Sequence, residues 1–329
     1  MQTRKLGNSD LEVPVICFGC WAIAGGQWWG EQDERDATDA MRLAVDIGLN
    51  FFDTAEGYGG GASEELLGRG LKGIRDDAII ATKASPSHHE PDALKQACED
   101  SLRRLQTDYI DVYQLHWPSR SVPFEDTWAA MEELIEEGKV RVGGVSNWGP
   151  QDLDEILQHG HPDVNQVSYS LLFRAIEHEI RPKCVEEKVS ILCYSPLMQG
   201  MLTGKYDGPD DVPEGRARSR HFSDEREGTR HGEEGAEEET FQAIDRIRDI
   251  CDDIGEEMTH VAVAWLIAQP GVGSVITGIR NPQQARENAA AADLSLPQDV
   301  IDRLDEATRP LEEKLGPNAD MWESESRIR

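Results

Sequence analysis

Basic residues are scarce in this sequence of 329 residues, and lysine is the rarest of them. Only 33 residues are Lys or Arg, nine of them lysine, against 63 that are Asp or Glu, so the formal net charge is −30. This charge repels the phosphates of nucleic acids and of anionic lipid headgroups. We therefore expect neither nucleic acid nor a membrane surface as a partner.

Long apolar runs are also missing. No stretch of about 18 apolar residues is available to span a membrane, and the first ten residues, MQTRKLGNSD, lack the apolar segment of a secretory signal. We expect a cytoplasmic protein. The length allows one large α/β domain or two ordinary ones; we predict a single domain over residues 1–329, and the sequence leaves its oligomeric state open.

Cysteine clusters typical of zinc sites are absent as well. The six cysteines are spread along the chain, and Cys17 and Cys20 form a lone CxxC in the segment CFGC. Zinc motifs usually add a second CxxC or spaced histidines, whereas Cys17 belongs to the apolar run VPVICFG. The adjacent pair His88–His89 falls in a polar turn. We interpret the cysteines as packed side chains and expect no metal site.

The acidic excess has two interpretations. At roughly 1 M salt the Debye length falls to about 3 Å, so self-repulsion costs little while hydrated carboxylates keep the protein in solution. In this respect the composition resembles that of proteins from salt-accumulating halophiles, which is the interpretation we favour. The alternative is an acidic mesophile protein that carries an acidic loop.

Short apolar segments alternate with amphipathic helical segments after an N-terminal hairpin, predicted over residues 2–13 with Gly7 and Asn8 at its tip. Several helical segments begin with an acidic or Ser cap and end at Gly. Eight strands joined by helices require parallel neighbours, and they fit a closed (β/α)8 TIM barrel better than an open doubly wound sheet. The predicted strands cover residues 13–19, 49–55, 77–84, 109–117, 142–148, 164–170, 190–197 and 273–279.

A long polar segment, residues 205–239, follows the seventh predicted strand. Its composition is too polar for a place in the core, and loops longer than about 15 residues are usually functional or disordered. Because it leaves the barrel at the carboxyl ends of the strands, it is either a lid over a bound ligand or a solvated insert. A C-terminal helix is predicted after the last strand.

Four side chains suited to carbonyl reduction follow predicted strands 2, 3 and 4, at the end where (β/α)8 barrels carry their chemistry. They are Asp53, Tyr58, Lys83 and His116. The ordinary pKa of a tyrosine is near 10, so we expect the Lys83 ammonium to lower the pKa of Tyr58 and Asp53 to hold Lys83 in place. His116 can donate a hydrogen bond to the substrate oxygen. Each residue alone also fits an ordinary structural role, and only their joint placement favours catalysis.

The segments DTAEGYG and QLHWP make the sequence similar to the aldo-keto reductase superfamily, and the resemblance extends from VICFGCWAIAGG to VITGIRNPQQARENAAA. It implies a nicotinamide-dependent reductase of aldehydes or ketones, with Asp53, Tyr58, Lys83 and His116 as catalytic tetrad and Tyr58 as proton donor. No G-x-G-x-x-G run follows a strand, so a Rossmann site is not expected. Some members of this family act mainly through protein partners, so an NADPH-binding regulatory or sensor subunit with little turnover is the alternative.

The resemblance also implies where the cofactor binds. Ser146, Asn147 and Gln166 match the group that grips the carboxamide, and Tyr194 matches the residue that stacks on the nicotinamide. The full predicted set is Cys20, Trp21, Ser146, Asn147, Gln166, Tyr194, Ser195, Pro196, Leu197, Gly200, Leu202, Gly204, Lys205, Gly278, Arg280, Gln284 and Asn288. Arg280 can pair with a 2′-phosphate, whereas Gln284 stands where many NADPH-specific relatives carry a basic residue. We expect NADPH to be favoured over NADH.

Aromatic residues dominate the segments expected around the substrate. The predicted pocket consists of Trp21, Trp28, Trp29, Tyr58 and Trp117, because aromatic walls around one polar cluster are typical of small-molecule sites. Tryptophans in cores or interfaces are the alternative. The expected partner is a small-molecule carbonyl compound whose identity the sequence does not select. A metal-dependent barrel enzyme would need carboxylates and histidines together at several strand ends.

Overall fold

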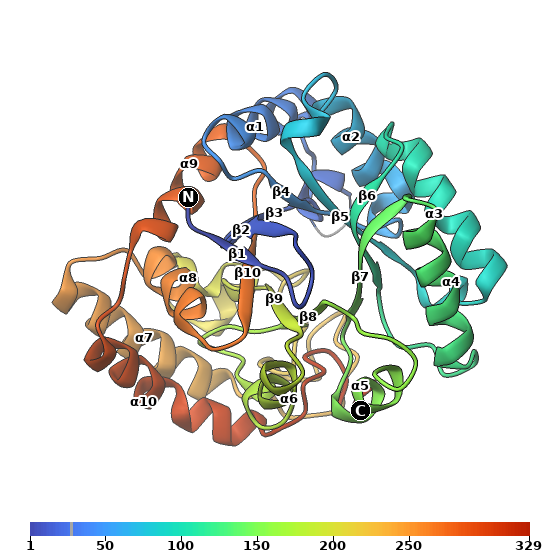
Figure 1. Cartoon of the computed structure of the whole chain (residues 1–329). Helices are drawn as coiled ribbons and strands as arrows, with labels where there is room; N and C mark the ends of the chain where they lie inside the picture. Colours follow the sequence, from blue (N-terminus) through green and yellow to red (C-terminus); the bar gives the residue numbers. More distant parts are fainter. Residues whose placement is uncertain (27–28) are drawn as a thin grey trace.

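Eight parallel strands form a closed barrel in the computed structural model, which describes residues 1–26 and 29–329 (Figure 1). Around the barrel the order is β10-β3-β4-β5-β6-β7-β8-β9, so each strand pairs with its neighbour in sequence and the last closes on the first. The strands are β3 (Ile16–Gly19), β4 (Phe51–Asp53), β5 (Ile79–Ala84), β6 (Ile110–Leu115), β7 (Val140–Ser146), β8 (Val164–Ser168), β9 (Ser190–Tyr194) and β10 (Val272–Gly278). The predicted (β/α)8 TIM barrel is confirmed, and every predicted strand overlaps one of these.

An antiparallel hairpin of β1 (Thr3–Lys5) and β2 (Glu12–Pro14) precedes the barrel, as predicted. The chain turns at Gly7, where φ is +55° and a side chain would collide with the backbone of Asp163. Leu6, Leu11 and Val13 are buried among the inward-facing apolar side chains of the barrel strands. The hairpin therefore closes the amino-terminal end of the barrel, and it crosses the centre of the view in Figure 1.

Ten helices surround the barrel in the described parts of the chain. They are α1 (Glu34–Asp46), α2 (Ala62–Gly70), α3 (Pro91–Leu105), α4 (Phe124–Glu136), α5 (Pro150–Ile156), α6 (Ile180–Glu186), α7 (Glu237–Ile254), α8 (Met258–Ala268), α9 (Pro282–Ala290) and α10 (Gln298–Leu315). The start of α1 shows how the sequence sets a boundary, because the Asp33 carboxylate accepts hydrogen bonds from the backbone N–H groups of Arg35 and Asp36. None of the helices described is long and apolar enough to cross a membrane.

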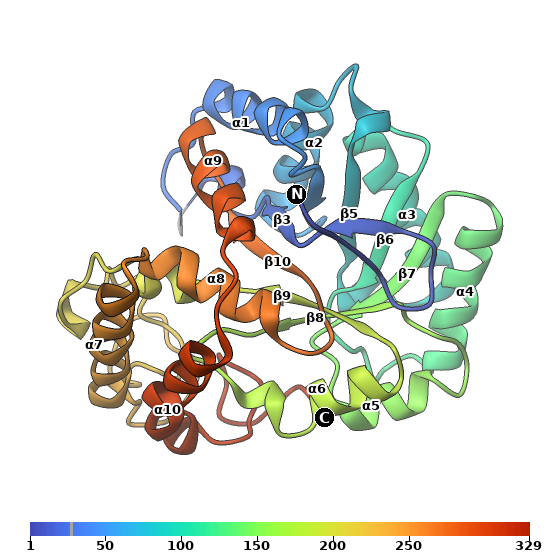
Figure 2. The ribbon, with the colours of Figure 1, turned by 60° about the vertical axis from the view of Figure 1, so that its left-hand side comes forward.

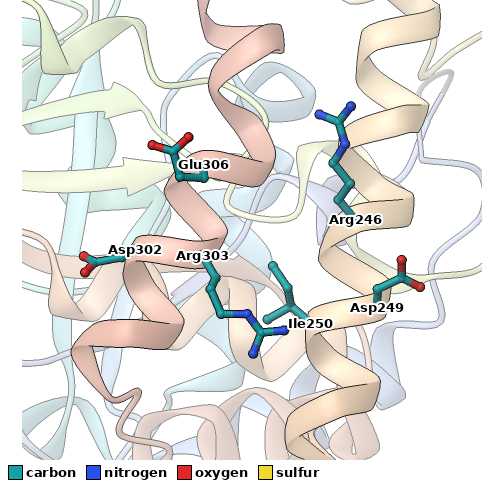
Figure 3. A pocket seen from close by; sticks show the side chains of 6 residues that line it. All are labelled: Arg246, Asp249, Ile250, Asp302, Arg303 and Glu306. Atoms are coloured by element: carbon teal, nitrogen blue, oxygen red, sulfur yellow. The ribbon is translucent and has the colours of Figure 1, made fainter.

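Two helices, α7 and α8, lie between β9 and β10 in sequence, and α7 packs against the predicted C-terminal helix, α10 (Figures 1 and 2). A hollow of about 430 Å³ lies between side chains of α7 and α10 on the outside of the molecule (Figure 3). Charged side chains surround it, and one of them, Arg303, pairs with Asp253 of α7 at 2.6 Å. This hollow belongs to the helical layer and is separate from the strand ends.

The polar segment between β9 and α7 contributes to the core, which corrects the prediction made from its composition. Ala217, His221 and Phe222 are buried. Arg220 donates hydrogen bonds to the main-chain oxygens of Leu315 and Asn318, at 2.8 and 3.0 Å. A few apolar and arginine side chains therefore fix this segment to the end of α10, even though most of its residues are polar.

A C-terminal tail, residues 316–329, follows α10 and ends against α5 (Figures 1 and 2). The main-chain oxygen of Arg329 accepts hydrogen bonds from the backbone N–H groups of Gln151 and Asp152, at 3.0 and 3.2 Å. Within the tail, the buried Asp320 carboxylate accepts two hydrogen bonds from the Arg327 guanidinium, at 2.6 and 3.0 Å. The tail is therefore held at its end and in its middle.

Candidate active site

Inside the barrel, a layer of polar side chains lies next to the layer of apolar ones. The polar residues stand two positions nearer the carboxyl end of their strands. Successive side chains of a strand point to opposite faces, so a strand that points an apolar residue inward points the residue two positions later inward as well. Four strands carry a polar residue at this second position: Asp53 on β4, Lys83 on β5, Gln114 on β6 and Gln166 on β8. All four side chains are buried. The alternation thus brings polar groups from distant parts of the chain to one level.

Lys83 is the centre of this layer. Its ammonium Nζ lies 2.8 Å from Asp53 Oδ2, 2.7 Å from the main-chain oxygen of Thr54 and 3.3 Å from the Tyr58 hydroxyl. The second oxygen of Asp53 accepts a hydrogen bond from Gln166 Nε2 at 2.7 Å. A fully buried ammonium needs such partners, because an isolated charge away from water is very costly.

Tyr58 reaches Lys83 because three glycines follow it. Gly59, Gly60 and Gly61 have φ values of +62°, +63° and +98°, a region that residues with a Cβ atom rarely adopt. At Gly61 a Cβ atom would also lie 2.7 Å from Arg104 Cδ. The glycines let the chain turn from β4 into α2 within a few residues, with the tyrosine at the start of the turn.

His116 lies directly after β6 and faces Tyr58 edge-on, with 5.9 Å between the ring centroids. Its backbone N–H donates to Ala84 at 2.9 Å, and its main-chain oxygen accepts from Asn147 Nδ2 at 3.1 Å. The structure therefore brings Asp53, Tyr58, Lys83 and His116 together at the carboxyl ends of the strands.

Burial and neighbouring charges shift the pKa values of Tyr58, Lys83 and His116. Burial raises the pKa of Tyr58 above its ordinary value, and the Lys83 ammonium opposes this rise without overcoming it. The predicted lowering of this pKa is wrong, because removing the phenolate from water costs more than a cation already paired with Asp53 recovers. Burial disfavours charged Lys83, but Asp53 and Tyr58 outweigh it and raise the Lys83 pKa. Burial, helped by Lys83, lowers the pKa of His116 to about 3, so this imidazole is uncharged at neutral pH.

A cleft of about 840 Å³ opens over the polar layer. The predicted residues that line it are Trp21, Trp29, Asp53, Tyr58, His116, Trp117, Ser146, Asn147, Gln166, Tyr194, Ser195, Pro196, Leu197, Gly200, Lys205, Gly278, Arg280 and Gln284. Lys83 lies behind Asp53 and Tyr58.

Four residues predicted to bind the cofactor do not line this cleft. Cys20 and Leu202 are fully buried, Gly204 is exposed, and Asn288 donates to the main-chain oxygen of Gly278 at 3.3 Å. Trp28 falls outside the described residues.

Tyr194, predicted to stack on the nicotinamide, forms a hydrogen-bonded chain with Asn147 and Ser146, two of the three residues predicted to hold the carboxamide. Tyr194 Oη donates to Asn147 Oδ1 at 2.9 Å, and Asn147 Nδ2 donates to Ser146 Oγ at 3.0 Å. Ser146 Oγ donates in turn to the main-chain oxygen of Gln166 at 2.9 Å. The Gln166 side chain differs from the prediction in its partner, since its amide nitrogen binds Asp53 and Gln114 in the polar layer.

The cleft also fits the phosphates of a dinucleotide. Gly200 has a φ of +99°, and a Cβ atom there would lie 2.8 Å from Lys205 Nζ and 3.8 Å from Arg216 Nη1. Two cationic side chains thus lie next to the backbone of Gly200, which has no side chain to keep a ligand away. Such an arrangement suits a phosphate group. Arg280 donates to the main-chain oxygen of Trp29 at 2.9 Å and to Gln32 Oε1 at 2.7 Å. It thereby joins the loop after β10 to the loop after β3.

Several lining residues were missed by the sequence argument, namely Arg216, Arg218 and Arg230 from the segment after β9 and Trp322 and Arg327 from the tail. A signal for Arg216 and Arg218 was present, because the segment GRARSR is unusually basic for so acidic a chain. Gln114 was missed too, although it stands two residues before His116 in the alternation of β6.

The sequence matches the family described as "Aldo/keto reductase family" over residues 15–309. The chain belongs to this family. The aldo-keto reductase YhdN of Bacillus subtilis is 33% identical over 299 residues, 86% of each chain. The NADH-specific methylglyoxal reductase of Escherichia coli is 32% identical and covers 90% of this chain and 95% of its own. A probable voltage-gated potassium channel subunit beta of Arabidopsis thaliana is 30% identical, covering 93% and 96%.

Solved structures of aldo/keto reductases share the architecture. One from Klebsiella pneumoniae, in complex with NADP and acetate, has a TM-score of 0.72 and 30% sequence identity, covering 92% of this chain and 94% of its own. As predicted, the protein is therefore an NAD(P)H-dependent oxidoreductase that converts an aldehyde or ketone to the alcohol. No group of three potential metal ligands gathers within residues 1–26 and 29–329.

Proposed function

We propose that this aldo/keto reductase uses Tyr58 as the proton donor to the carbonyl oxygen, with Lys83, Asp53 and His116 as its partners. NADPH, when bound, supplies the hydride. Neutral His116 donates a hydrogen bond that orients the carbonyl, and Lys83 stabilises the tyrosinate left after the proton has moved. Asp53 keeps Lys83 charged and directed at the hydroxyl.

The observation that carries this proposal is the contact of 3.3 Å between Lys83 Nζ and the Tyr58 hydroxyl, in a site where the ammonium is fully buried. The raised pKa of Tyr58 keeps the phenol protonated before reaction. A cation at this distance favours the anion that forms when the proton leaves. The phenol is thus in its donating form at rest, with its charge compensation already in place.

We propose that Ser146, Asn147, Gln166 and Tyr194 hold the nicotinamide end, and that Gly200, Lys205 and Arg280 hold the phosphates. NADPH is the favoured cofactor, supported by the NADP in the Klebsiella relative, and NADH is possible, since the Escherichia coli relative is named NADH-specific. The substrate proposed is a small aldehyde or ketone between Trp21, Trp29 and Trp117. The methylglyoxal named for that Escherichia coli relative is of this class.

We make three further proposals about the whole chain. We propose that residues 1–329 form one domain, built on the single closed barrel, and that the protein works in the cytoplasm. The third proposal, which the acidic composition supports, is that its acidic surface is an adaptation to high salt. With a net charge of −30, repulsion within the folded state is relieved when salt screens it.

A regulatory subunit is the second candidate, because the Arabidopsis relative is named as a channel subunit. Such a role needs an apolar surface on which a partner docks. Among the described residues, the exposed large hydrophobic side chains are Met1, Ile47 and Val185. Met1 lies beside Gly48, next to Ile47, whereas Val185 belongs to α6. So few side chains do not form a large apolar surface, and catalysis is the better supported function.

Steady-state kinetics with NADPH and with NADH over a panel of aldehydes, ketones and sugars tests the proposal. We expect turnover of at least one aldehyde, with a higher kcat/KM for NADPH. Binding of NADPH without turnover of any member of the panel would favour the regulatory subunit.

A further inference from the structure

We propose that the substrate of this enzyme carries an acidic group, a carboxylate or a phosphate, in addition to its carbonyl. Arg230 and Arg327 are the residues that we infer bind it. The inference rests on the proposed function, since the same cleft performs the reduction, and it adds the chemical class of the substrate.

The charge of the cleft is opposite to that of the protein. Six cationic side chains line it: Lys205, Arg216, Arg218, Arg230, Arg280 and Arg327. A single carboxylate, that of Asp53, lines it among the described residues, and Lys83 neutralises this group at 2.8 Å. The chain as a whole has 63 acidic and 33 basic residues. A cleft lined by one sign of charge concentrates ligands of the other sign.

Three of these six cationic side chains lie at the proposed binding sites for the cofactor phosphates. Lys205 and Arg216 meet at the backbone of Gly200, and Arg280 follows β10. These three side chains lie along the proposed phosphate sites of NADPH. The other three, Arg218, Arg230 and Arg327, contact or belong to the C-terminal tail, and none of them is among the residues proposed to hold the cofactor phosphates.

Arg218 and Arg327 lie at the end of the cleft where we expect the substrate. The guanidinium carbon of Arg327 stands 3.8 Å from the ring centroid of Trp117, the residue after His116. The guanidinium carbon of Arg218 lies 5.3 Å from the ring centroid of Trp322, a residue of the tail. Trp117 follows β6, which is opposite β10 in the strand order of the barrel. An acidic group held here is therefore remote from the adenosine end and adjacent to the reacting carbonyl.

Glu323 shows that a carboxylate fits between these guanidiniums. Its Oε1 lies 3.7 Å from Arg230 Nη1 and 3.4 Å from Arg327 Nη1. Both distances exceed the roughly 2.7–2.9 Å of a tight charge-assisted hydrogen bond. The side chains of Glu323 and Arg230 are 30% and 56% exposed, so both can move. Because Asp320 holds the opposite edge of Arg327, an acid of the substrate can replace Glu323 without releasing the tail.

Matched substrate pairs test the inference. We would measure kcat/KM with NADPH for succinic semialdehyde against butanal, and for glyceraldehyde 3-phosphate against glyceraldehyde, at the lowest salt that keeps the enzyme folded. We expect the acidic member of at least one pair to be preferred about tenfold or more, as a hydrogen bond to a charged group provides. A preference in the first pair would indicate that the site binds a carboxylate, and a preference in the second pair that it binds a phosphate.

Two variants should change this preference in opposite directions. Arg230→Gln should lower kcat/KM for the acidic substrate about tenfold more than for its neutral partner, because it removes one cation that binds the acidic group. Glu323→Gln should raise the preference, because it removes the competing carboxylate. Arg303→Gln, in the hollow between α7 and α10 (Figure 3), removes an arginine remote from the cleft and serves as the control that leaves the preference unchanged.

Quenching of tryptophan fluorescence by glutarate, an acid without a reducible carbonyl, gives a readout independent of turnover. It should saturate at lower concentration for Glu323→Gln than for Arg230→Gln. Reduction of the neutral aldehydes with no preference for acidic ones would overturn this inference and leave the proposed function intact. Loss of NADPH affinity in Arg230→Gln, with the preference unchanged, would instead assign Arg230 to the cofactor. Failure to reduce any aldehyde would contradict the proposed function itself.

Discussion

At the scale of single residues, the buried pair of Lys83 and Asp53 is hard to explain as a stability device. Both charges are nearly or fully removed from water, and burying an ion pair often costs as much as the attraction returns. Gln166 and the main-chain oxygen of Thr54 supply additional hydrogen bonds that keep the pair in place. The arrangement is better explained by what it does to Tyr58, whose hydroxyl contacts Lys83 and whose side chain lines the cleft.

The pH dependence of the reaction is the prediction at this scale. An ordinary histidine gains its proton as the pH falls through about 6.5, whereas His116 stays neutral until about pH 3. Since the pKa of Tyr58 is raised, its phenol also stays protonated through neutral pH. We therefore expect kcat/KM for reduction to be nearly constant between pH 5 and pH 8, in rate measurements with a fixed aldehyde. A step centred near pH 6.5 that disappears in His116→Gln would show that this histidine titrates normally.

At the scale of elements, the loops after β3 and β10 are joined by Arg280, which binds the main-chain oxygen of Trp29 and the side chain of Gln32. The same guanidinium is the proposed partner of the 2′-phosphate of NADPH. Binding of the phosphate and fastening of the loop are therefore carried by one side chain.

Separate substitutions distinguish these two contributions. Arg280→Ala should weaken NADPH binding by roughly 10- to 100-fold, in line with a hydrogen bond to a charged group worth about 1.5–3 kcal/mol. NADH binding should weaken less, because NADH lacks the phosphate. Gln32→Ala removes both hydrogen bonds between Gln32 and Arg280, keeps the guanidinium and should affect the binding of both cofactors alike. Fluorescence titration measures all four affinities. Equal losses of affinity for NADPH and NADH in Arg280→Ala would contradict the proposed contact between Arg280 and the 2′-phosphate.

Most elements could be predicted because their patterns are local. The eight strands are apolar segments between capped helices, and the polar layer follows from alternation along each strand. The tail was different: Trp322 and Arg327 follow the last helix without periodicity, and contacts with Asp320, Trp117 and α5 determine their place. The pKa of Tyr58 was mistaken for a related reason, since a sequence identifies the neighbouring cation but does not measure the burial that opposes it.

At the scale of the whole molecule, the net charge of −30 means that the folded state repels itself at low ionic strength. The cationic cleft is the local exception to this acidic excess. We expect the Tm to rise by several degrees between 0.1 M and 2 M KCl, because a gain of only ~1 kcal/mol shifts the Tm of a large domain by about 2 °C or more. Differential scanning fluorimetry, with sucrose of equal osmolarity as the control, measures this. An unchanged Tm, or an equal rise in sucrose, would contradict the proposed salt adaptation.

The central claim is that the Tyr58 hydroxyl delivers the proton, and the variant Tyr58→Phe tests it most directly, since it removes one oxygen and keeps the aromatic ring. The measurement is the single-turnover rate of aldehyde reduction with saturating NADPH, alongside the NADPH dissociation constant of the same preparation. Positioned acids contribute about 10² to 10⁴ in rate, so the account predicts a loss of at least two orders of magnitude with cofactor affinity unchanged. A rate close to that of the unmodified enzyme would contradict it.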